Sequence, residues 1–178
     1  MEPLARHRTD RTKNLVGFLV GNVRYAVDIL RVREIVNPLV TVALPHAPHG
    51  VVGVADHRGE VVPILDLRMR FALQATAPTR RTKWIIVSRA QRSVGLIVDA
   101  VTDVFGTGEP DQRSVPELGG GDATRGIAAV YSHDGSLVFV LDVDRVVATT
   151  ESLDMRALEG LISKPPPARP ERAGRERP

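Results

Sequence analysis

The chain has 178 residues, of which 43% are hydrophobic, 25% are charged and none is cysteine. This length suits one domain, or two small halves that share a core, and the apolar fraction is too high for a disordered chain. The absence of cysteine excludes disulfide bonds, thiolate metal ligands and a thiol nucleophile. Because no apolar run reaches the roughly 20 residues of a membrane span or resembles a signal peptide, the sequence predicts a cytoplasmic protein without direct membrane insertion.

The net charge of +3 is unevenly distributed along the chain. Residues 1–13 carry a net +2 and residues 164–178 a net +3, so residues 14–163 carry −2. The basic character therefore belongs to the two tails, and an aromatic content of 4% leaves few rings on which bases could stack. A nucleic-acid-binding barrel protein with basic tails is the alternative hypothesis, but the folded part is not expected to bind nucleic acid.

Short apolar runs separated by turn residues dominate the first half. Two such runs in residues 15–28 flank a Gly-Asn pair, which predicts a hairpin. In residues 29–36 apolar side chains recur at the spacing of one helix face, which predicts a short helix ended by an Asn-Pro pair. Residues 40–44 are predicted to form a strand. Residues 51–67 predict a second hairpin with an Arg-Gly turn, and residues 68–71 one helical turn.

The second half has the same pattern of short apolar runs separated by turn residues. Residues 83–99 and 126–143 predict two more hairpins, the latter with an Asp-Gly turn. Between them, residues 106–126 form a long predicted loop whose run of three glycines should be mobile. Residues 143–148 and 151–162 are predicted to be helical, the second with Ser152 as its cap.

These elements define the predicted organisation. Residues 14–163 form the folded domain, preceded by the basic tail of residues 1–13. Residues 164–178, rich in proline and arginine, are predicted to be disordered.

A weak internal repeat links the two halves. Three pairs of segments match in the same order, 69 to 76 residues apart: 32–36 with 101–105, 53–55 with 126–128, and 59–67 with 135–143. Chance is the alternative, since valine-rich strands after glycine turns look alike. We favour two similar, interleaved halves, the second from about residue 84, each with about five short strands, as in a small barrel.

The residues show no chemistry typical of an enzyme. The dinucleotide, phosphate-loop and nucleophile-elbow motifs are all missing from the sequence, so we expect neither catalysis nor a cofactor. His46, His49 and His57 could in principle bind a metal ion. The first two lie in a Pro-rich segment that cannot form a regular helix, so exposed loop histidines are the simpler interpretation and no metal site is predicted.

Several charged residues have structural explanations. Asp66 and Asp142 follow apolar strands at equivalent positions and are predicted to cap the short helices after them, and Asp99 is predicted to do likewise. Arg58, at a hairpin tip, is by itself a solvated charge, although arginine is also common at protein interfaces. Glu34 is predicted to pair with a neighbouring arginine or with a partner protein.

Taken in order, five segments of the sequence resemble CheW-like domains. They are YAVDILRVREIV, GVADHRGEVVPILDLRMRF, VGLIVDAVTDVF, GIAAV and LVFVLDVDRVV. The match covers roughly residues 15–150, and the block from Arg58 to Arg68 is its most specific part. The resemblance implies a mainly β fold of two SH3-like five-stranded β-barrel subdomains, with short helices and a C-terminal helix.

The same resemblance implies a chemosensory adaptor in the bacterial cytoplasm, recruited to receptor arrays and without catalytic activity. Its expected partners are the regulatory domain of a CheA-type histidine kinase, the cytoplasmic tips of methyl-accepting chemoreceptors, and other CheW-like domains.

The resemblance also assigns two groups of site residues. The receptor-binding groove is implied for Val32, Glu34, Ile35, Val36, Val101 and Val104. The kinase-coupling turn is implied for Asp56, His57, Arg58 and Gly59. CheW-like domains usually have asparagine and an apolar residue before Arg-Gly, where this chain has Asp56 and His57, so the charge and polarity of the turn differ from the family pattern.

Overall fold

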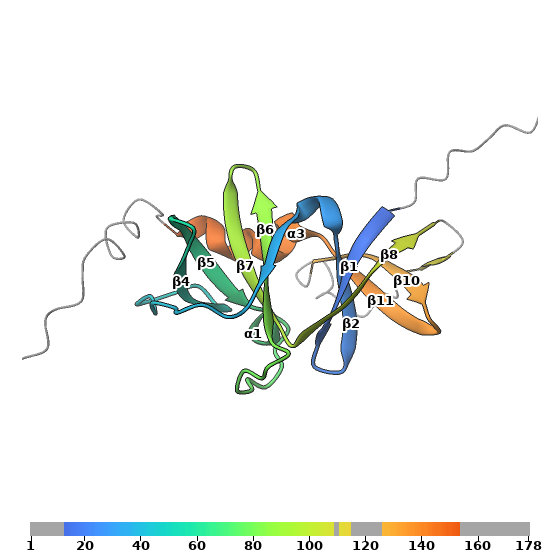
Figure 1. Cartoon of the computed structure of the whole chain (residues 1–178), viewed down its shortest axis with the longest axis horizontal. Coiled ribbons are helices and arrows are strands. Elements are labelled where there is room, and N and C mark those ends of the chain that lie inside the picture. The colour runs from blue at the N-terminus through green and yellow to red at the C-terminus, as the bar shows by residue number, and fades with distance from the viewer. Residues whose placement is uncertain (1–12, 109–110, 115–125, 154–178) are drawn as a thin grey trace, which may run out of the picture.

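The computed structural model describes residues 13–108, 111–114 and 126–153, which form a mainly β structure of two sheets. Figure 1 shows the sheets side by side. The six-stranded sheet has the order β8-β1-β2-β11-β10-β9 and consists of β1 (Lys13–Val20), β2 (Val23–Asp28), β8 (Ala100–Thr107), β9 (Gln112–Arg113), β10 (Ile127–His133) and β11 (Ser136–Leu141). The five-stranded sheet has the order β3-β6-β7-β5-β4 and consists of β3 (Val32–Val36), β4 (Val51–His57), β5 (Glu60–Asp66), β6 (Lys83–Arg89) and β7 (Arg92–Val98). The helical segments are η1 (Ile29–Arg31), α1 (Leu67–Arg70), α3 (Val143–Val146) and η3 (Val147–Ser152).

The elements follow one another as a repeat of hairpin, single strand, hairpin and short helix. The first repeat contains β1–β2, β3, β4–β5 and α1; the second contains β6–β7, β8, β10–β11 and α3, with the short β9 in addition. Each sheet combines the opening hairpin of one repeat with the later strands of the other. The parallel pairs β2–β11 and β5–β7 make this exchange, so each sheet contains strands from both repeats.

The mainly β prediction is confirmed, although each sheet is open where the sequence predicted a closed five-stranded barrel. In the five-stranded sheet, β3 and β4 are the two edges, and a single bridge between Val42 and Val54 connects the chain after β3 to β4. A side chain at Gly53 would place its Cβ 2.3 Å from the Val42 carbonyl oxygen, so this approach requires glycine. In the other sheet β9 adds a sixth strand.

Two local predictions are wrong. The predicted helix over residues 29–36 is only a 3₁₀ turn, η1, followed by strand β3 paired with β6. Half of the residues in this segment are β-branched, which favours a strand. A short apolar run cannot distinguish the helix period from the strand period when a bulge interrupts the strand. Residues 40–44 form no strand beyond the bridge at Val42, since prolines at positions 38 and 45 bracket the segment.

Other predictions fall partly outside the described residues. The predicted loop over residues 106–126 contains β9, and its glycine run lies outside the described residues. The helix predicted for residues 151–162 also lies mostly outside them. At its start Ser152 ends η3 and donates to the Thr149 carbonyl oxygen, and the helix that it was expected to cap lies outside the described residues.

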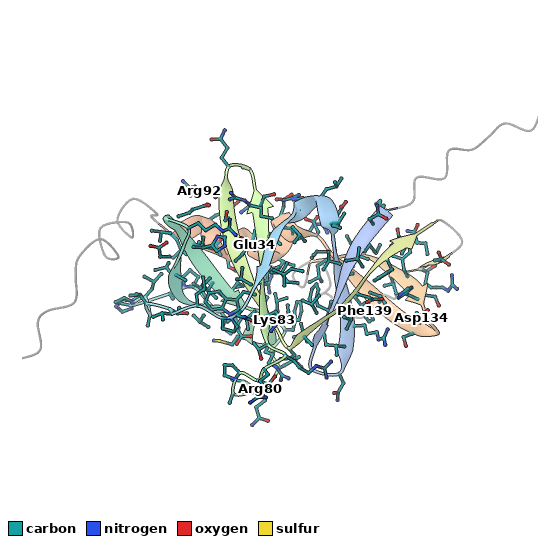
Figure 2. The ribbon with its side chains drawn as sticks, in the orientation of Figure 1. Glu34, Arg80, Lys83, Arg92, Asp134 and Phe139 are labelled. Carbon is teal, nitrogen blue, oxygen red and sulfur yellow. The ribbon has the colours of Figure 1, made fainter. Side chains whose placement is uncertain are left out.

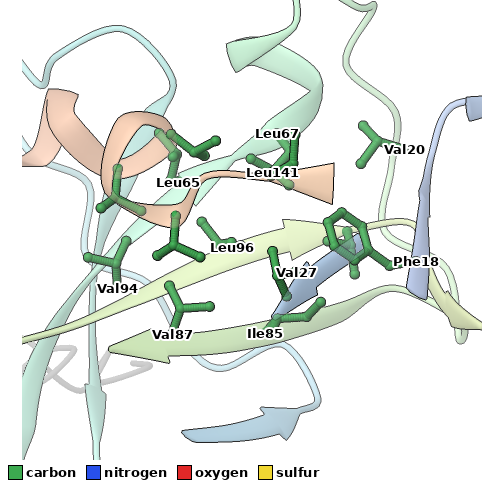
Figure 3. Packing of buried hydrophobic residues seen from close by; sticks show 14 of the residues in the cluster. Phe18, Val20, Val27, Leu65, Leu67, Ile85, Val87, Val94, Leu96 and Leu141 are labelled. Carbon is green, nitrogen blue, oxygen red and sulfur yellow. The ribbon is translucent and has the colours of Figure 1, made fainter. Parts of the chain in front are cut away.

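The main core lies between the two sheets. Figure 3 shows Phe18 and Val27 of the six-stranded sheet packed with Ile85 and Leu96 of the five-stranded sheet, all fully buried. Side chains from α3 and η3 complete the same cluster. One continuous apolar cluster therefore holds both sheets in a fixed relation, on which the surface site depends. Truncating a buried residue such as Phe18 to alanine costs about 3–5 kcal/mol in comparable cores.

Candidate functional site

The Arg-Gly turn is a tight two-residue hairpin connection between β4 and β5. Arg58 and Gly59 both have positive φ, 56° and 80°, as the favoured type I′ hairpin turn requires. The Asp56 carboxylate accepts a hydrogen bond of 2.8 Å from the Gly59 amide. The turn is thus fixed from within, and Arg58, whose side chain is 75% exposed, projects from its tip.

Glu34 lies directly against this turn. Its Oε1 accepts a hydrogen bond of 2.7 Å from Arg58 Nη2, and its Oε2 lies 3.1 Å from His57 Nε2. Only 13% of the His57 side chain is exposed, so Glu34 bridges one half-buried and one exposed partner. Glu34 comes from β3 and the turn joins β4 to β5, so the curl of the sheet brings its two edges together here. Glu34, which the resemblance assigned to the receptor-binding groove, is therefore in contact with the turn assigned to the kinase.

Glu34 pairs with neither of the two neighbouring arginines that the sequence offered as alternatives to a partner protein. Arg31 instead forms an ion pair with Asp144, at 2.7 Å, and Arg33 pairs with Glu60, at 3.0 Å. Glu60 also accepts from the Ser93 amide. In a strand the side chains of neighbouring positions point to opposite faces, which separates Arg33 from Glu34, and Arg31 lies before the strand, in η1.

The predicted apolar groove residues divide by exposure. Val32, Val36 and Val101 are half-buried and pack against the core clusters. Ile35 and Val104 are 39% and 59% exposed, at the outer edges of the two sheets. Sequence reasoning missed two neighbours of β3: Leu30 and Val40, which flank this strand in the chain, are 85% and 89% exposed. Nothing in their local pattern marks them as exposed.

The predicted caps are correct in two of three cases. Asp66 accepts from the Arg68 amide at the start of α1, and Asp142 accepts from the Asp144 amide at the start of α3. Asp99 caps no helix, because β8 begins at the next residue. Its carboxylate instead accepts two hydrogen bonds of 2.7 Å from Arg68, which raise the pKa of that arginine, and one from the Gly21 amide.

The histidines considered as metal ligands lie apart. His49 contacts the Met69 carbonyl oxygen, His57 contacts Glu34, and His46 lies in an exposed turn. Within the described ranges they share no cluster of metal-ligating side chains. A cavity of about 690 Å³ lies beside the Arg-Gly turn, between Gly59, Pro63, Arg92 and Thr150, and no feature of the sequence predicts it. No helix in the described residues is long and apolar enough to cross a membrane.

The family model of the CheW-like domain matches residues 14–151. The chain belongs to the CheW-like domain family. It is 34% identical to the chemotaxis protein CheW of Rhizobium meliloti over 152 residues, which cover 85% of this chain and 97% of that protein. Protein FrzA of Myxococcus xanthus is 31% identical over 120 residues, 67% of this chain and 74% of that one.

The fold agrees with a solved member of the CheW-like family. The crystal structure of the scaffolding protein TtCheW from Thermoanaerobacter tengcongensis matches with a TM-score of 0.68 and 26% sequence identity, and the match covers 74% of this chain and 90% of that one. The mainly β, two-sheet architecture is thus that of a CheW-like domain.

Proposed function

We propose that this chain is a chemosensory adaptor that couples methyl-accepting chemoreceptors to a CheA-type histidine kinase by protein–protein binding, without catalysis. It acts in the cytoplasm, and other CheW-like domains in receptor arrays are further partners. The proposal rests on family membership and on one structural observation: the ion pair between Glu34 and Arg58 joins an edge strand to a hairpin tip.

The ion pair connects Glu34, which is assigned to the receptor-binding groove, to Arg58, which is assigned to the kinase-coupling turn. Arg58 has spare guanidinium donors at a tip that is 75% exposed, which suits it to bind a carboxylate or carbonyl of a partner. Glu34 adjoins Ile35, whose apolar side chain is partly exposed on β3. A partner that binds at either place can alter the other through the shared carboxylate, which is what coupling of receptor to kinase requires.

The receptor tip is proposed to bind along the edge strands. Ile35 of β3 and Val104 of β8 offer exposed apolar side chains, and Val32, Val36 and Val101 of the same two strands are half-buried. A helical tip with an apolar stripe is the partner that such a surface accepts. The turn of residues 56–59 is proposed to couple to the kinase regulatory domain.

Charge reversal at the turn tests this proposal. Arg58→Glu removes the ion pair and places two carboxylates together, so we expect binding to the kinase regulatory domain or to the receptor tip to weaken at least tenfold, about 1.4 kcal/mol. Isothermal titration calorimetry with each purified partner measures the change.

Arg80→Glu is the matched control. Arg80 lies in the exposed segment between α1 and β6, is labelled in Figure 2, and carries the same charge change away from Glu34. Unchanged binding of both partners by Arg58→Glu, with the wild-type fold retained by circular dichroism, would refute the role of Arg58. A wild-type chain that binds neither partner would refute the adaptor function itself.

A further inference from the structure

The two edge strands β3 and β8 occupy equivalent places in their sheets. Ile35 pairs with Ile85 of β6, and Val104 pairs with Val16 of β1, the strand that corresponds to β6 in the other repeat. Both strands have a register shift, in each case next to the acidic residue that precedes this pair. Glu34 and Asp103 are therefore counterparts, one in each sheet.

The hairpin tips that face these acids are also counterparts. Both are two-residue turns with positive φ at each central residue, Arg58-Gly59 in one sheet and Asp134-Gly135 in the other. In each case a histidine precedes the turn and contacts the acid of the edge strand. His133 Nε2 donates to Asp103 Oδ2 at 2.9 Å, as His57 contacts Glu34.

The third position differs in charge between the two sheets. In the five-stranded sheet it is Arg58, whose guanidinium neutralises Glu34. In the six-stranded sheet it is Asp134, whose Oδ2 lies 3.6 Å from His133 Nε2. A cation that closes the first cluster is thus replaced by a second carboxylate, and Figure 2 shows Asp134 at the far end of the molecule from Glu34. Arg24 acts on Asp103 only through its longer-range charge.

The local structure holds these groups in place. The His133 ring stacks on Phe105 with ring centres 3.9 Å apart and planes 9° apart, which fixes its orientation. Thr102 donates a hydrogen bond of 2.6 Å to the other oxygen of Asp103. Gly17 of β1 leaves the space for this carboxylate, because a Cβ there would lie 2.7 Å from Asp103 Oδ1. Burial alone would raise the pKa of Asp103, but the hydrogen bonds from Thr102 and His133 outweigh it and lower that pKa, so the carboxylate is ionised.

We propose that Asp103, His133 and Asp134 form a binding site for a divalent transition-metal ion, with Zn²⁺ the best match. One imidazole nitrogen and two carboxylate oxygens are donors that Zn²⁺ accepts, and water completes its coordination. Tetrahedral ligands at about 2.1 Å from zinc are roughly 3.4 Å apart. The three donor atoms here all lie within 4.8 Å of one another, and the two His133 distances are 2.9 and 3.6 Å.

Metal binding has two consequences at this site. The ion takes the place of the hydrogen through which His133 Nε2 contacts Asp103, and the neutral imidazole then carries its N–H at Nδ1. The ion also ties edge strand β8 to the β10–β11 hairpin, in the way that the Arg58 guanidinium ties β3 to β4–β5. It therefore stabilises the six-stranded sheet.

The test uses the untagged full-length chain and Zn²⁺ as the probe. Isothermal titration calorimetry should show one bound ion per chain, and the melting temperature should rise with the Zn²⁺ concentration. Asp134→Asn should weaken binding at least tenfold and reduce the rise in melting temperature at each Zn²⁺ concentration. Asparagine tolerates the positive φ of this exposed turn position, so the variant should fold.

Asp111→Asn is the matched control, since it removes the same charge elsewhere and retains the oxygen that accepts from the Gly108 amide. It should bind Zn²⁺ like the wild type. Co²⁺ absorption bands of a tetrahedral site, present in the wild type and lost in Asp134→Asn, would support the assignment by a separate readout. The absence of saturable Zn²⁺ binding by the wild type, or equal binding by Asp134→Asn, would overturn it.

Discussion

Asp144 accepts two hydrogen bonds from Arg31, a residue 113 positions earlier in the chain. These bonds lower the pKa of Asp144, and they raise the pKa of Arg31. The bridge connects η1, after the opening hairpin, to α3 near the end of the second repeat. At the residue scale, then, an ion pair reinforces the contact between distant parts of the chain.

This bridge predicts a particular dependence on pH. Because the pKa of Asp144 in the folded chain lies below the ordinary value of 3.8, its stabilisation is complete above that pH and is lost as the pH falls through the folded-state pKa. We expect Asp144→Asn to destabilise the fold by up to about 1 kcal/mol at pH 7, since the aspartate is 52% exposed. Urea unfolding should show the difference shrink at about pH 3; an equal difference at both pH values would contradict the assignment.

Among the secondary-structure elements, the hairpins could be predicted from the sequence, whereas strand β3 and the contacts between sheet edges could not. All the predicted hairpins are present, because a turn signal between two apolar runs is local information. Strand β3 was mistaken for a helix, because its five residues are compatible with either period. The contact of Glu34 with Arg58 could not be predicted, because it depends on the curl that brings opposite edges of one sheet together. The contact recurs in the second repeat, where His133 contacts Asp103 as His57 contacts Glu34.

At the sheet edge, the exposed apolar residues yield a prediction about binding. Ile35→Asp and Val104→Asp place a charge where the receptor tip is proposed to bind, so each should weaken receptor binding at least tenfold while the fold persists. Leu137→Asp, at a 53% exposed position of β11, serves as the control and should bind normally. Receptor-peptide titrations measure the three variants; normal binding by both edge variants would remove the proposed groove.

The approach between Gly53 and the Val42 carbonyl oxygen gives a prediction about stability. Gly53→Ala adds a clash with backbone to the strain of its positive φ. Gly135→Ala carries similar strain with no atom within 4 Å of the added Cβ, and should cost about 1 kcal/mol. Gly53→Ala should therefore lower the free energy of unfolding by clearly more, as measured by urea denaturation. Equal losses would mean that the bridge can relax to make room.

For the whole molecule, the exchange of hairpins makes the two repeats interdependent. A fragment of residues 1–82 lacks the central strands β6 and β7 of the five-stranded sheet, and a fragment of residues 83–178 lacks β1 and β2 of the other. We expect neither fragment alone to unfold cooperatively, because each leaves the shared core half-formed, whereas the mixed fragments should recover a cooperative transition. Circular dichroism melts test this; a fragment that melts cooperatively by itself would contradict it.

The same exchange sets an order of events during protein synthesis. All strands of the five-stranded sheet come from one continuous stretch, residues 32–98, so that sheet can assemble as soon as this stretch leaves the ribosome. The six-stranded sheet must wait, because β2 pairs with β11, more than a hundred residues later. Throughout that interval the β1–β2 hairpin exposes an unpaired edge, the feature that invites wrong pairing between nascent chains. The β1–β2 hairpin, which precedes the other described strands in the chain, is therefore among the last to be protected.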